Sequence, residues 1–166
     1  MFITVCGQKG GVAKTCTSIH LASVWHSQGK KVCIVDADKN RSALAYSSRG
    51  NIPFPVFPVS SAAKASRDSE IVITDGQASS DEEELKHLAY GSDLVIIPTT
   101  PKARSVELTV ELASLLNSQK VKHAVLIVKV DSRKQKAAYQ AREALLKFGL
   151  EVFDGFIPLL LSLIHI

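Results

Sequence analysis

Short apolar runs alternate with longer amphipathic segments along the whole chain. The apolar runs are continuous, which indicates strands covered on both faces, and the segments between them have helical spacing. We expect strands over residues 2–6, 31–38, 70–75, 93–101, 123–130 and 150–158, and helices over 14–28, 42–48, 81–89, 103–118 and 135–148. Segment 51–59 holds three prolines and is at best a short edge strand.

This alternation predicts the fold class. Strands that regularly alternate with helices form βαβ units around a parallel sheet. We therefore expect an α/β fold, a mostly parallel twisted sheet with helices on both faces. The sequence has no internal repeat, no low-complexity tract and no linker, so we assign residues 1–158 to a single domain.

A glycine-rich loop, CGQKGGVAKT, follows the first predicted strand at residues 6–15. It departs from the strict phosphate-binding pattern G-x-x-x-x-G-K-[ST], because Gln8 and Ala13 replace its two glycines. Both departures keep the backbone N–H groups, which at the start of a helix can cradle phosphate. The predicted nucleotide-binding residues are Gly10, Gly11, Val12, Ala13, Lys14, Thr15 and Cys16.

Carboxylates follow two of the predicted strands. Asp36 and Asp38 end segment 31–38, and Asp75 ends segment 70–75. Ligands of open parallel sheets bind at the carboxyl ends of the strands, where these side chains would meet the glycine-rich loop. Lys14 would contact the β- and γ-phosphates, and the Thr15 hydroxyl would bind Mg²⁺. The combination predicts a nucleoside triphosphate site.

These segments resemble the deviant Walker A ATPases of the ParA/MinD class, and especially the ParA branch. QKGGVAKT is similar to the deviant Walker A motif, KKVCIVDADKNRSALAY to the segment that carries V-L-L-I-D-x-D-P-Q-x-S-A, and SEIVITDGQAS to the Walker B strand. SDLVIIPTTPKARSVELTVELASLL resembles the strand, turn and helix that follow. The resemblance covers about residues 2–158. Its clearest departure is Lys39-Asn40, where the family has Pro-Gln after the second aspartate.

The resemblance implies a role for each polar residue of the site. Lys9 would reach across an ATP-sandwich homodimer to the partner's phosphates, which makes hydrolysis conditional on dimerisation. Asp38 would orient or activate the attacking water, so that Lys9, Lys14 and Asp38 are the catalytic residues. Thr15, Asp36 and Asp75 would form the metal side, with Asp75 holding Mg²⁺ through water. Hydrolysis of ATP is expected to be slow and to be stimulated by an adaptor and DNA.

The base-binding end of the site is less defined by the sequence. VKVD, residues 128–131, is close to the guanine-reading motif [NT]-K-x-D, but Val128 lacks the polar group of its first position. GTP therefore stays an alternative. The resemblance favours adenine, bound near residues 129–131 and 157–158.

The charge of the chain is unevenly distributed. Its net charge is +4, and residues 118–149 alone carry +6, from Lys120, Lys122, Lys129, Arg133, Lys134, Lys136, Arg142 and Lys147 against two acids. Such a segment is either a footprint for nucleic acid or a solvated helix face. With the resemblance, it predicts non-specific DNA binding by the ATP dimer and release by a ParB-like adaptor that carries a plasmid or another cargo.

Composition bounds the other possibilities. The chain has 166 residues, no apolar run of 18 or more and no basic leader, so we expect a cytoplasmic protein. The resemblance implies that it is also associated with the nucleoid. Its five histidines lack zinc-ligand spacing. Its three cysteines form no C-x-x-C pair and are predicted to be reduced thiols, mostly buried.

Other functions of the same fold class remain as alternatives. A MinD-like membrane switch needs a basic amphipathic C-terminal helix, and residues 158–166, PLLLSLIHI, carry no lysine or arginine. Positioning of a protein compartment is a further possibility, as is a synthetase or a metal-cluster reductase. The apolar tail 159–166 matches no pattern of the family, and we interpret it as a truncation or a non-native segment.

Overall fold

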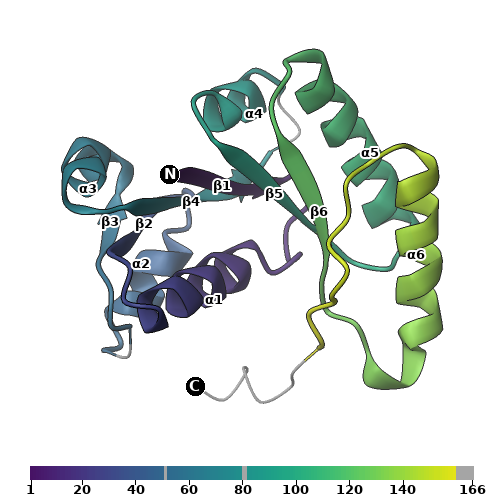
Figure 1. Cartoon of the computed structure of the whole chain (residues 1–166), viewed down its shortest axis with the longest axis horizontal. Coiled ribbons are helices and arrows are strands. Elements are labelled where there is room, and N and C mark those ends of the chain that lie inside the picture. The colour runs from purple at the N-terminus through teal and green to yellow at the C-terminus, as the bar shows by residue number, and fades with distance from the viewer. Residues whose placement is uncertain (51, 80–81, 160–166) are drawn as a thin grey trace.

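A six-stranded parallel sheet forms the centre of the protein (Figure 1). The structure is a computed structural model that describes residues 1–50, 52–79 and 82–159. The strand order is β3-β2-β4-β1-β5-β6, and each strand runs parallel to its neighbours. The strands are β1 (Phe2–Gly7), β2 (Val32–Ala37), β3 (Val56–Pro58), β4 (Ile71–Ala78), β5 (Leu94–Thr99) and β6 (His123–Ile127).

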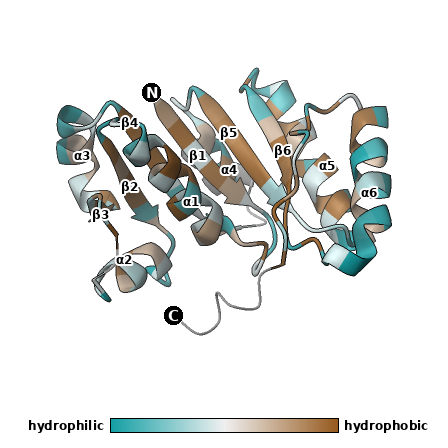
Figure 2. Ribbon diagram, turned by 60° about the horizontal axis from the view of Figure 1, so that its bottom comes forward, coloured by the Kyte–Doolittle hydropathy of each residue, from teal (hydrophilic) through white to brown (hydrophobic). Residues whose placement is uncertain are grey.

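Helices cover both faces of this sheet, as the sequence predicts (Figures 1 and 2). The described α-helices are α1 (Lys14–Ser27), α2 (Ser42–Ser47), α3 (Ala62–Asp68), α4 (Glu82–Ala89), α5 (Ala103–Ser118) and α6 (Gln135–Lys147). Short 3₁₀ turns, η1 (Val59–Ser61) and η2 (Ser132–Lys134), precede α3 and α6. Helices α1 and α2 pack on one face, whereas α3, α4 and α5 pack on the other and α6 packs beside α5.

The core alternates between the two faces along each strand. In β2, Ile34 packs in the cluster with α1 and α2, whereas its neighbours Cys33 and Val35 pack with α3. In β5, Ile96 belongs to the first face, and Val95 and Ile97 belong to the cluster with α4, α5 and α6. Both faces of a strand are therefore apolar, which explains the continuous apolar runs of the sequence.

The register brings acidic residues to the same level of the sheet. Asp36 of β2 lies opposite Asp75 of β4, and Asp75 lies opposite Val5 of β1. A register shift between Val5 and Gly7 then lets β4 continue beside β1 as far as Ala78. The end of β4 thus reaches the glycine-rich loop, three residues farther than the sequence predicts.

Most predicted elements are confirmed, with α5 matching its predicted bounds. The strand predicted over 123–130 ends at Ile127, because Lys129 has a left-handed φ of 56° that breaks the extended chain. The strand predicted over 150–158 is wrong: a bend at 154–155 leaves only isolated bridges at Val152 and Pro158. The predicted residues 51, 81 and 160–166 lie outside the described part of the chain.

Helix α3 is an element for which the sequence gives little signal. Ala62 and Ala65 are the hydrophobic side chains with which it packs against Cys33, Val35 and Val72. Alanine favours a helix, but two alanines make no apolar stripe that periodicity could detect. The predicted edge strand among the prolines is β3, at the end of the sheet.

Candidate functional site

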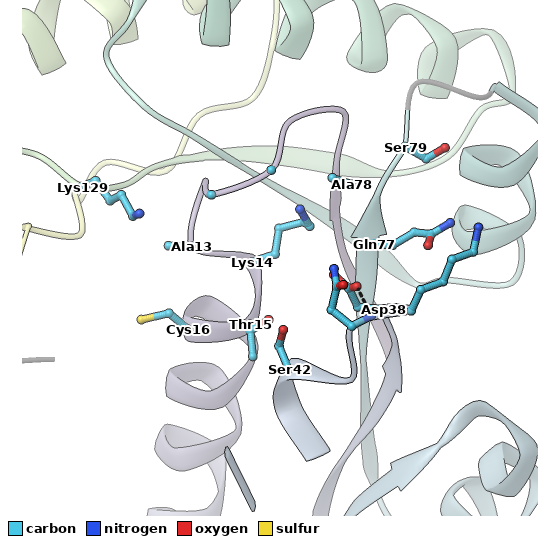
Figure 3. A pocket seen from close by; sticks show the side chains of 14 residues that line it. Ala13, Lys14, Thr15, Cys16, Asp38, Ser42, Gln77, Ala78, Ser79 and Lys129 are labelled. Carbon is cyan, nitrogen blue, oxygen red and sulfur yellow. Dashed lines mark hydrogen bonds between the residues drawn. The ribbon is translucent and has the colours of Figure 1, made fainter. Parts of the chain in front are cut away.

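An open pocket of about 830 Å³ lies at the carboxyl edge of the sheet. In the described part of the chain, its lining comes from four places that are distant in sequence: the glycine-rich loop with the start of α1, the loop after β2, the end of β4, and Lys129 after β6. Figure 3 shows Lys129 at one end and Asp38 and Gln77 at the other, with Lys14 and Thr15 between them. The carboxyl ends of the parallel strands meet here, as the sequence predicts.

The glycine-rich loop forms the floor of the pocket. Of the seven predicted nucleotide-binding residues, only Val12 does not line it among the described residues. The Val12 side chain is instead buried and contacts a small cavity beside β5 and α5, which anchors the loop. Gly11 and Ala13 both adopt left-handed backbone conformations, with φ of 74° and 60°. These left-handed conformations direct the chain into α1, which begins at Lys14, at the pocket.

Lys14 is a largely buried ammonium group at the middle of the pocket. Its Nζ donates a hydrogen bond to the carbonyl oxygen of Lys9 at 3.2 Å. Burial lowers the pKa of Lys14, whereas the negative charges of Asp38 and Asp75 oppose this shift. An anion bound in the pocket would stabilise the charged form in the same way.

Asp75 is completely buried behind Thr15. Its Oδ1 accepts a hydrogen bond from the Ser18 hydroxyl at 3.0 Å, while Oδ2 has no hydrogen bond of normal geometry among the described residues. Burial raises the pKa of Asp75 to about 6; the hydroxyls of Thr15 and Ser18 oppose this rise, and the charges of Asp36 and Asp38 add to it. A buried carboxylate with an unused oxygen suits a hydrated cation beside it.

The Mg²⁺ predicted here fits the residues present, provided that it keeps water and phosphate ligands. Among the described residues, no group of three or more His, Cys, Asp or Glu side chains could hold a metal ion. Mg²⁺ usually retains several waters and takes one or two protein oxygens together with substrate phosphates. Thr15 and the unused Oδ2 of Asp75 are compatible with such a partial shell.

Asp36 and Asp38 hold the loop that follows β2. Asp36 is buried, and its two carboxylate oxygens accept hydrogen bonds from the backbone N–H groups of Asp38 at 3.1 Å and Leu44 at 2.9 Å. Asp38 is half-buried and lines the pocket, where its Oδ1 accepts from the N–H of Asn40 at 2.8 Å. Asp36 therefore positions Asp38, and its predicted role on the metal side stays a prediction.

Lys9 does not line the pocket in the described part of the protein. It borders the small cavity that also contacts Val12, Ser105 and Thr109, although its carbonyl oxygen faces Lys14. The side chain of Lys9 therefore adds no positive charge to the pocket of its own chain. This is compatible with the predicted action on a partner chain, which stays a prediction.

The structure adds residues that the sequence reasoning did not name as site residues. Gln77, Ala78 and Ser79 line the pocket because β4 continues past Asp75, and Ser42 lines it from the start of α2. The sequence signal that could have identified these lining residues was the polar Gln77, which follows the apolar strand segment after Asp75. Lys39 and Asn40, noted as a departure from the family pattern, also line it.

Lys129 lies at the end of the pocket where a base was predicted. Its exposed side chain lines the pocket near Ala13 and Cys16 (Figure 3). Asp131 does not line the pocket; its carboxylate accepts hydrogen bonds from Arg133, which hold the pKa of Asp131 below its usual value. Asp131 is therefore not placed to make the contact with a base that the aspartate of the guanine-reading motif would make. Residues 157–158 pair with the end of β6 and do not line the pocket.

The basic segment 118–149 divides into two clusters at opposite edges of the sheet. Lys120 and Lys122 come just before β6, and Lys147 ends α6, so these lysines lie at the edge of the sheet away from the pocket. Figure 1 shows α6 running back beside β6. Lys129, Arg133, Lys134 and Lys136 lie near the carboxyl edge, where Figure 2 shows hydrophilic residues at the start of α6. Arg142 is paired with Asp154. The basic residues of this segment therefore lie on two separate parts of the protein.

The cysteines agree with the predicted thiols. All three are free, and Cys6 and Cys33 are buried. Burial raises the pKa of Cys6 to about 12 and also raises the pKa of Cys16, which borders the pocket.

Comparison with known proteins decides the family. The model of the CobQ/CobB/MinD/ParA nucleotide binding domain matches residues 3–164. The chain belongs to this family. It is 27% identical over 164 residues to the maintenance of carboxysome distribution protein A of Gloeobacter kilaueensis, covering 93% of this chain and 75% of that protein. It is 24% identical over 168 residues to protein ParA of Rhizobium radiobacter, covering 92% and 75%.

Solved structures of other proteins share the fold. The MinD cell division protein of Aquifex aeolicus has a TM-score of 0.77 and 19% identity, covering 99% of this chain and 84% of that one. Cobyrinic acid a,c-diamide synthase of Mycobacterium smegmatis, solved with a bound ATP analogue and magnesium, has a TM-score of 0.75 and 20% identity, covering 96% and 87%. None of the helices described in this ParA/MinD-type chain is long and apolar enough to cross a membrane.

Replacing Ala13 by glycine should stabilise the protein. Ala13 has a φ of 60°, a conformation that costs an L-residue with a Cβ about 1–2 kcal/mol and a glycine almost nothing. After subtraction of the greater freedom of glycine in the unfolded chain, Ala13→Gly should raise the free energy of unfolding by about 0.5–1 kcal/mol. Urea unfolding measures it. Ala144→Gly, within α6, is the matched control and should destabilise by about 1 kcal/mol; equal losses in both variants would contradict the strain at Ala13.

The raised pKa of Asp75 predicts a stability that falls as the pH rises. The native carboxyl titrates at about 6 and the unfolded one near 3.8, so the native state binds more protons between these values. From this group alone, nucleotide-free protein should lose about 2 kcal/mol of unfolding free energy from pH 4 to pH 6. Urea unfolding should show that Asp75→Asn removes this component.

The control for this measurement is an exposed acid with the opposite shift. Hydrogen bonds from Lys31 and Lys30 lower the pKa of Glu70. Glu70→Gln should therefore leave unchanged the decrease in unfolding free energy with rising pH that is due to Asp75. An unchanged pH slope in Asp75→Asn would show that Asp75 is not the titrating group.

Proposed function

We propose that this chain is a ParA-type ATPase that positions plasmid DNA or another large cargo. It forms a sandwich homodimer on binding ATP, binds DNA without sequence specificity, and is released when a ParB-like adaptor stimulates slow hydrolysis. The observation that carries the proposal is the convergence of Lys14 and Thr15 with Asp38 and Asp75 at one edge of the sheet. Among the residues that the structure describes, three lysines and one aspartate line the pocket, which favours an anionic ligand.

Each residue has a task that its surroundings support. The loop 10–16 binds phosphate through its N–H groups, and Lys14 neutralises the β- and γ-phosphates. Thr15, and Asp75 through water, hold Mg²⁺, which when bound neutralises charge on the phosphate oxygens. Asp38 keeps one oxygen on Asn40 and orients the attacking water with the other. Asp36 fixes the loop of Asp38 and adds negative charge behind the metal.

Lys9 supplies the second cation from the partner chain. Its side chain lies outside its own pocket, so one chain alone lacks that charge at its site. Phosphoryl transfer spreads charge over the transferred group and the leaving oxygen, and a cation delivered on dimerisation would stabilise both. Turnover then depends on the dimer.

The cargo is a separate question, on which the relatives give two candidates. One relative is named ParA and the other a carboxysome distribution protein, so positioning of a protein compartment is the second candidate. A MinD-like action on membranes is the third, supported by the shared fold of the MinD structure. Arg133, Lys134 and Lys136, exposed near the pocket edge, favour a polyanion such as DNA.

Mixing two inactive variants tests the trans action of Lys9. Lys9→Ala and Asp38→Ala should each lower ATP turnover by a factor of about 10²–10⁴. In a mixed dimer, one site combines the intact Asp38 of the first variant with the intact Lys9 of the second. An equimolar mixture should therefore recover about a quarter of the unsubstituted turnover, since half of the dimers have one complete site.

The control replaces one partner in the mixture by a variant that cannot complete either site. Lys9→Ala mixed with Lys9/Asp38 double alanine should stay inactive. If the first mixture also stays inactive while both variants still dimerise with ATP, Lys9 does not act across the dimer.

Retention on DNA tests the cargo-binding step. ATP should increase retention on random-sequence DNA at low salt, and retention should fall steeply as salt is raised. The Lys134/Lys136 double alanine variant should weaken retention and reduce the salt slope by about 2. The matched control, Lys120/Lys122 double alanine at the opposite edge, should retain the slope. ATP-dependent retention on anionic vesicles instead of DNA would favour the MinD-like alternative.

A further inference from the structure

The loop after β2 has a defined shape that carries a lysine to the pocket. The N–H groups of Asp38 and Asn40 are held by aspartate carboxylates, and the N–H of Arg41 donates to the Asp38 carbonyl oxygen at 2.9 Å. Arg41 then takes a left-handed φ of 51° before α2 begins. The turn is therefore fixed on both sides of Lys39, whose exposed side chain lines the pocket.

Lys39 belongs to the end of the pocket opposite Lys129. It stands directly after Asp38, which Figure 3 places with Gln77 at that end, and Ser42 of the same loop and helix start also lines it. On the proposed function, the base lies at the Lys129 end. The last phosphate of the nucleotide then lies at the Asp38 end.

That end of the pocket is rich in negative charge. Asp38 lines it, Asp36 and Asp75 lie behind it, and the charges of Asp36 and Asp38 act on Asp75 across the edge of the sheet. A terminal phosphate placed beside these carboxylates would be repelled unless cations accompany it. Lys14 serves the middle of the pocket, whereas Lys39 is the lysine that the same chain adds at this end.

We propose that Lys39 is a specificity-determining residue that makes the pocket prefer a nucleoside triphosphate to a diphosphate. It contacts the terminal phosphate from within the same chain, whether or not a partner is bound. The family pattern that this sequence resembles has proline at this position, so the cation is a property of this chain. The inference rests on the proposed nucleotide site and concerns its selectivity.

The test is carried out on full-length Lys9→Ala protein, which removes any lysine contributed by a partner. Calorimetry measures the affinity for Mg-AMPPNP and for Mg-ADP before and after Lys39→Ala. The affinity for AMPPNP should fall about tenfold, the effect of one charge-assisted hydrogen bond, and that for ADP should change by less than about twofold. Lys39→Arg should keep the preference.

Two further variants make the result specific. Lys129→Ala, at the opposite end, should weaken both nucleotides to the same extent and leave their ratio unchanged. Lys39→Gln keeps the aliphatic stem without the charge and should behave like Lys39→Ala, which separates the charge from packing of the loop. Circular dichroism and the melting temperature should be unchanged, since Lys39 is exposed.

Failure of this inference differs from failure of the proposed function. If Lys39→Ala leaves the ratio of the two affinities unchanged, Lys39 is a solvated lysine at the rim and the inference is overturned, although the nucleotide site stands. If the unsubstituted chain binds neither nucleotide, the proposed function itself fails.

Discussion

Two buried opposite charges that do not touch constrain the whole carboxyl edge of this protein. Lys14 and Asp75 are both removed from solvent, yet no ion pair joins Lys14 to an aspartate in the described part of the chain. Burial moves each pKa toward the neutral form, lower for Lys14 and higher for Asp75. A ligand that is anionic toward the lysine and cationic toward the aspartate would relieve both, and a phosphate with a bound metal ion has that character.

The sheet explains why these groups can be held apart. Asp75 is fixed by parallel pairing with β1 and β2, on which Val5 and Asp36 lie at its level. Lys14 begins a helix whose entry is set by the left-handed turn at Ala13. One turn later, the Ser18 hydroxyl lies within hydrogen-bond distance of two acceptors, the Lys14 carbonyl oxygen and Asp75. The positions of both groups therefore follow from backbone geometry.

The sequence predicts the strands and helices around this site better than it predicts the residues that line the pocket. Continuous apolar runs identify the main strands, and the spacing of residues 103–118 predicts α5 to the residue. The loop 10–16 and Asp38 are found where the motif places them, because a motif of this kind specifies backbone as well as side chains. The continuation of β4 to Ala78 could not be predicted, since it depends on a register shift in β1 that only pairing reveals.

Charge was the property that the sequence described least well. Residues 118–149 look like one basic segment, but β6 crosses the sheet between Lys120 and Lys136, so these two lysines lie at opposite edges. Lys39, by contrast, looked like a simple departure from a family pattern. It lines the pocket because two backbone turns at Asp38 and Asn40 direct the chain there.

The lysines of the pocket are distributed along its length, and this distribution restricts the ligand. Lys129 follows β6, Lys14 opens α1 and Lys39 follows β2, so each comes from a different connection at the carboxyl edge. Cations separated in this way, with Asp38 at one end, match a ligand whose negative charge is extended and most concentrated at its terminus. A single phosphate group could engage only part of this row, whereas a nucleoside triphosphate could engage all of it, with its base at the Lys129 end and its phosphates from Lys14 to Asp38. Removal of the last phosphate would leave the carboxylates at that end without their anionic neighbour, so hydrolysis itself would change the charge balance beside α2.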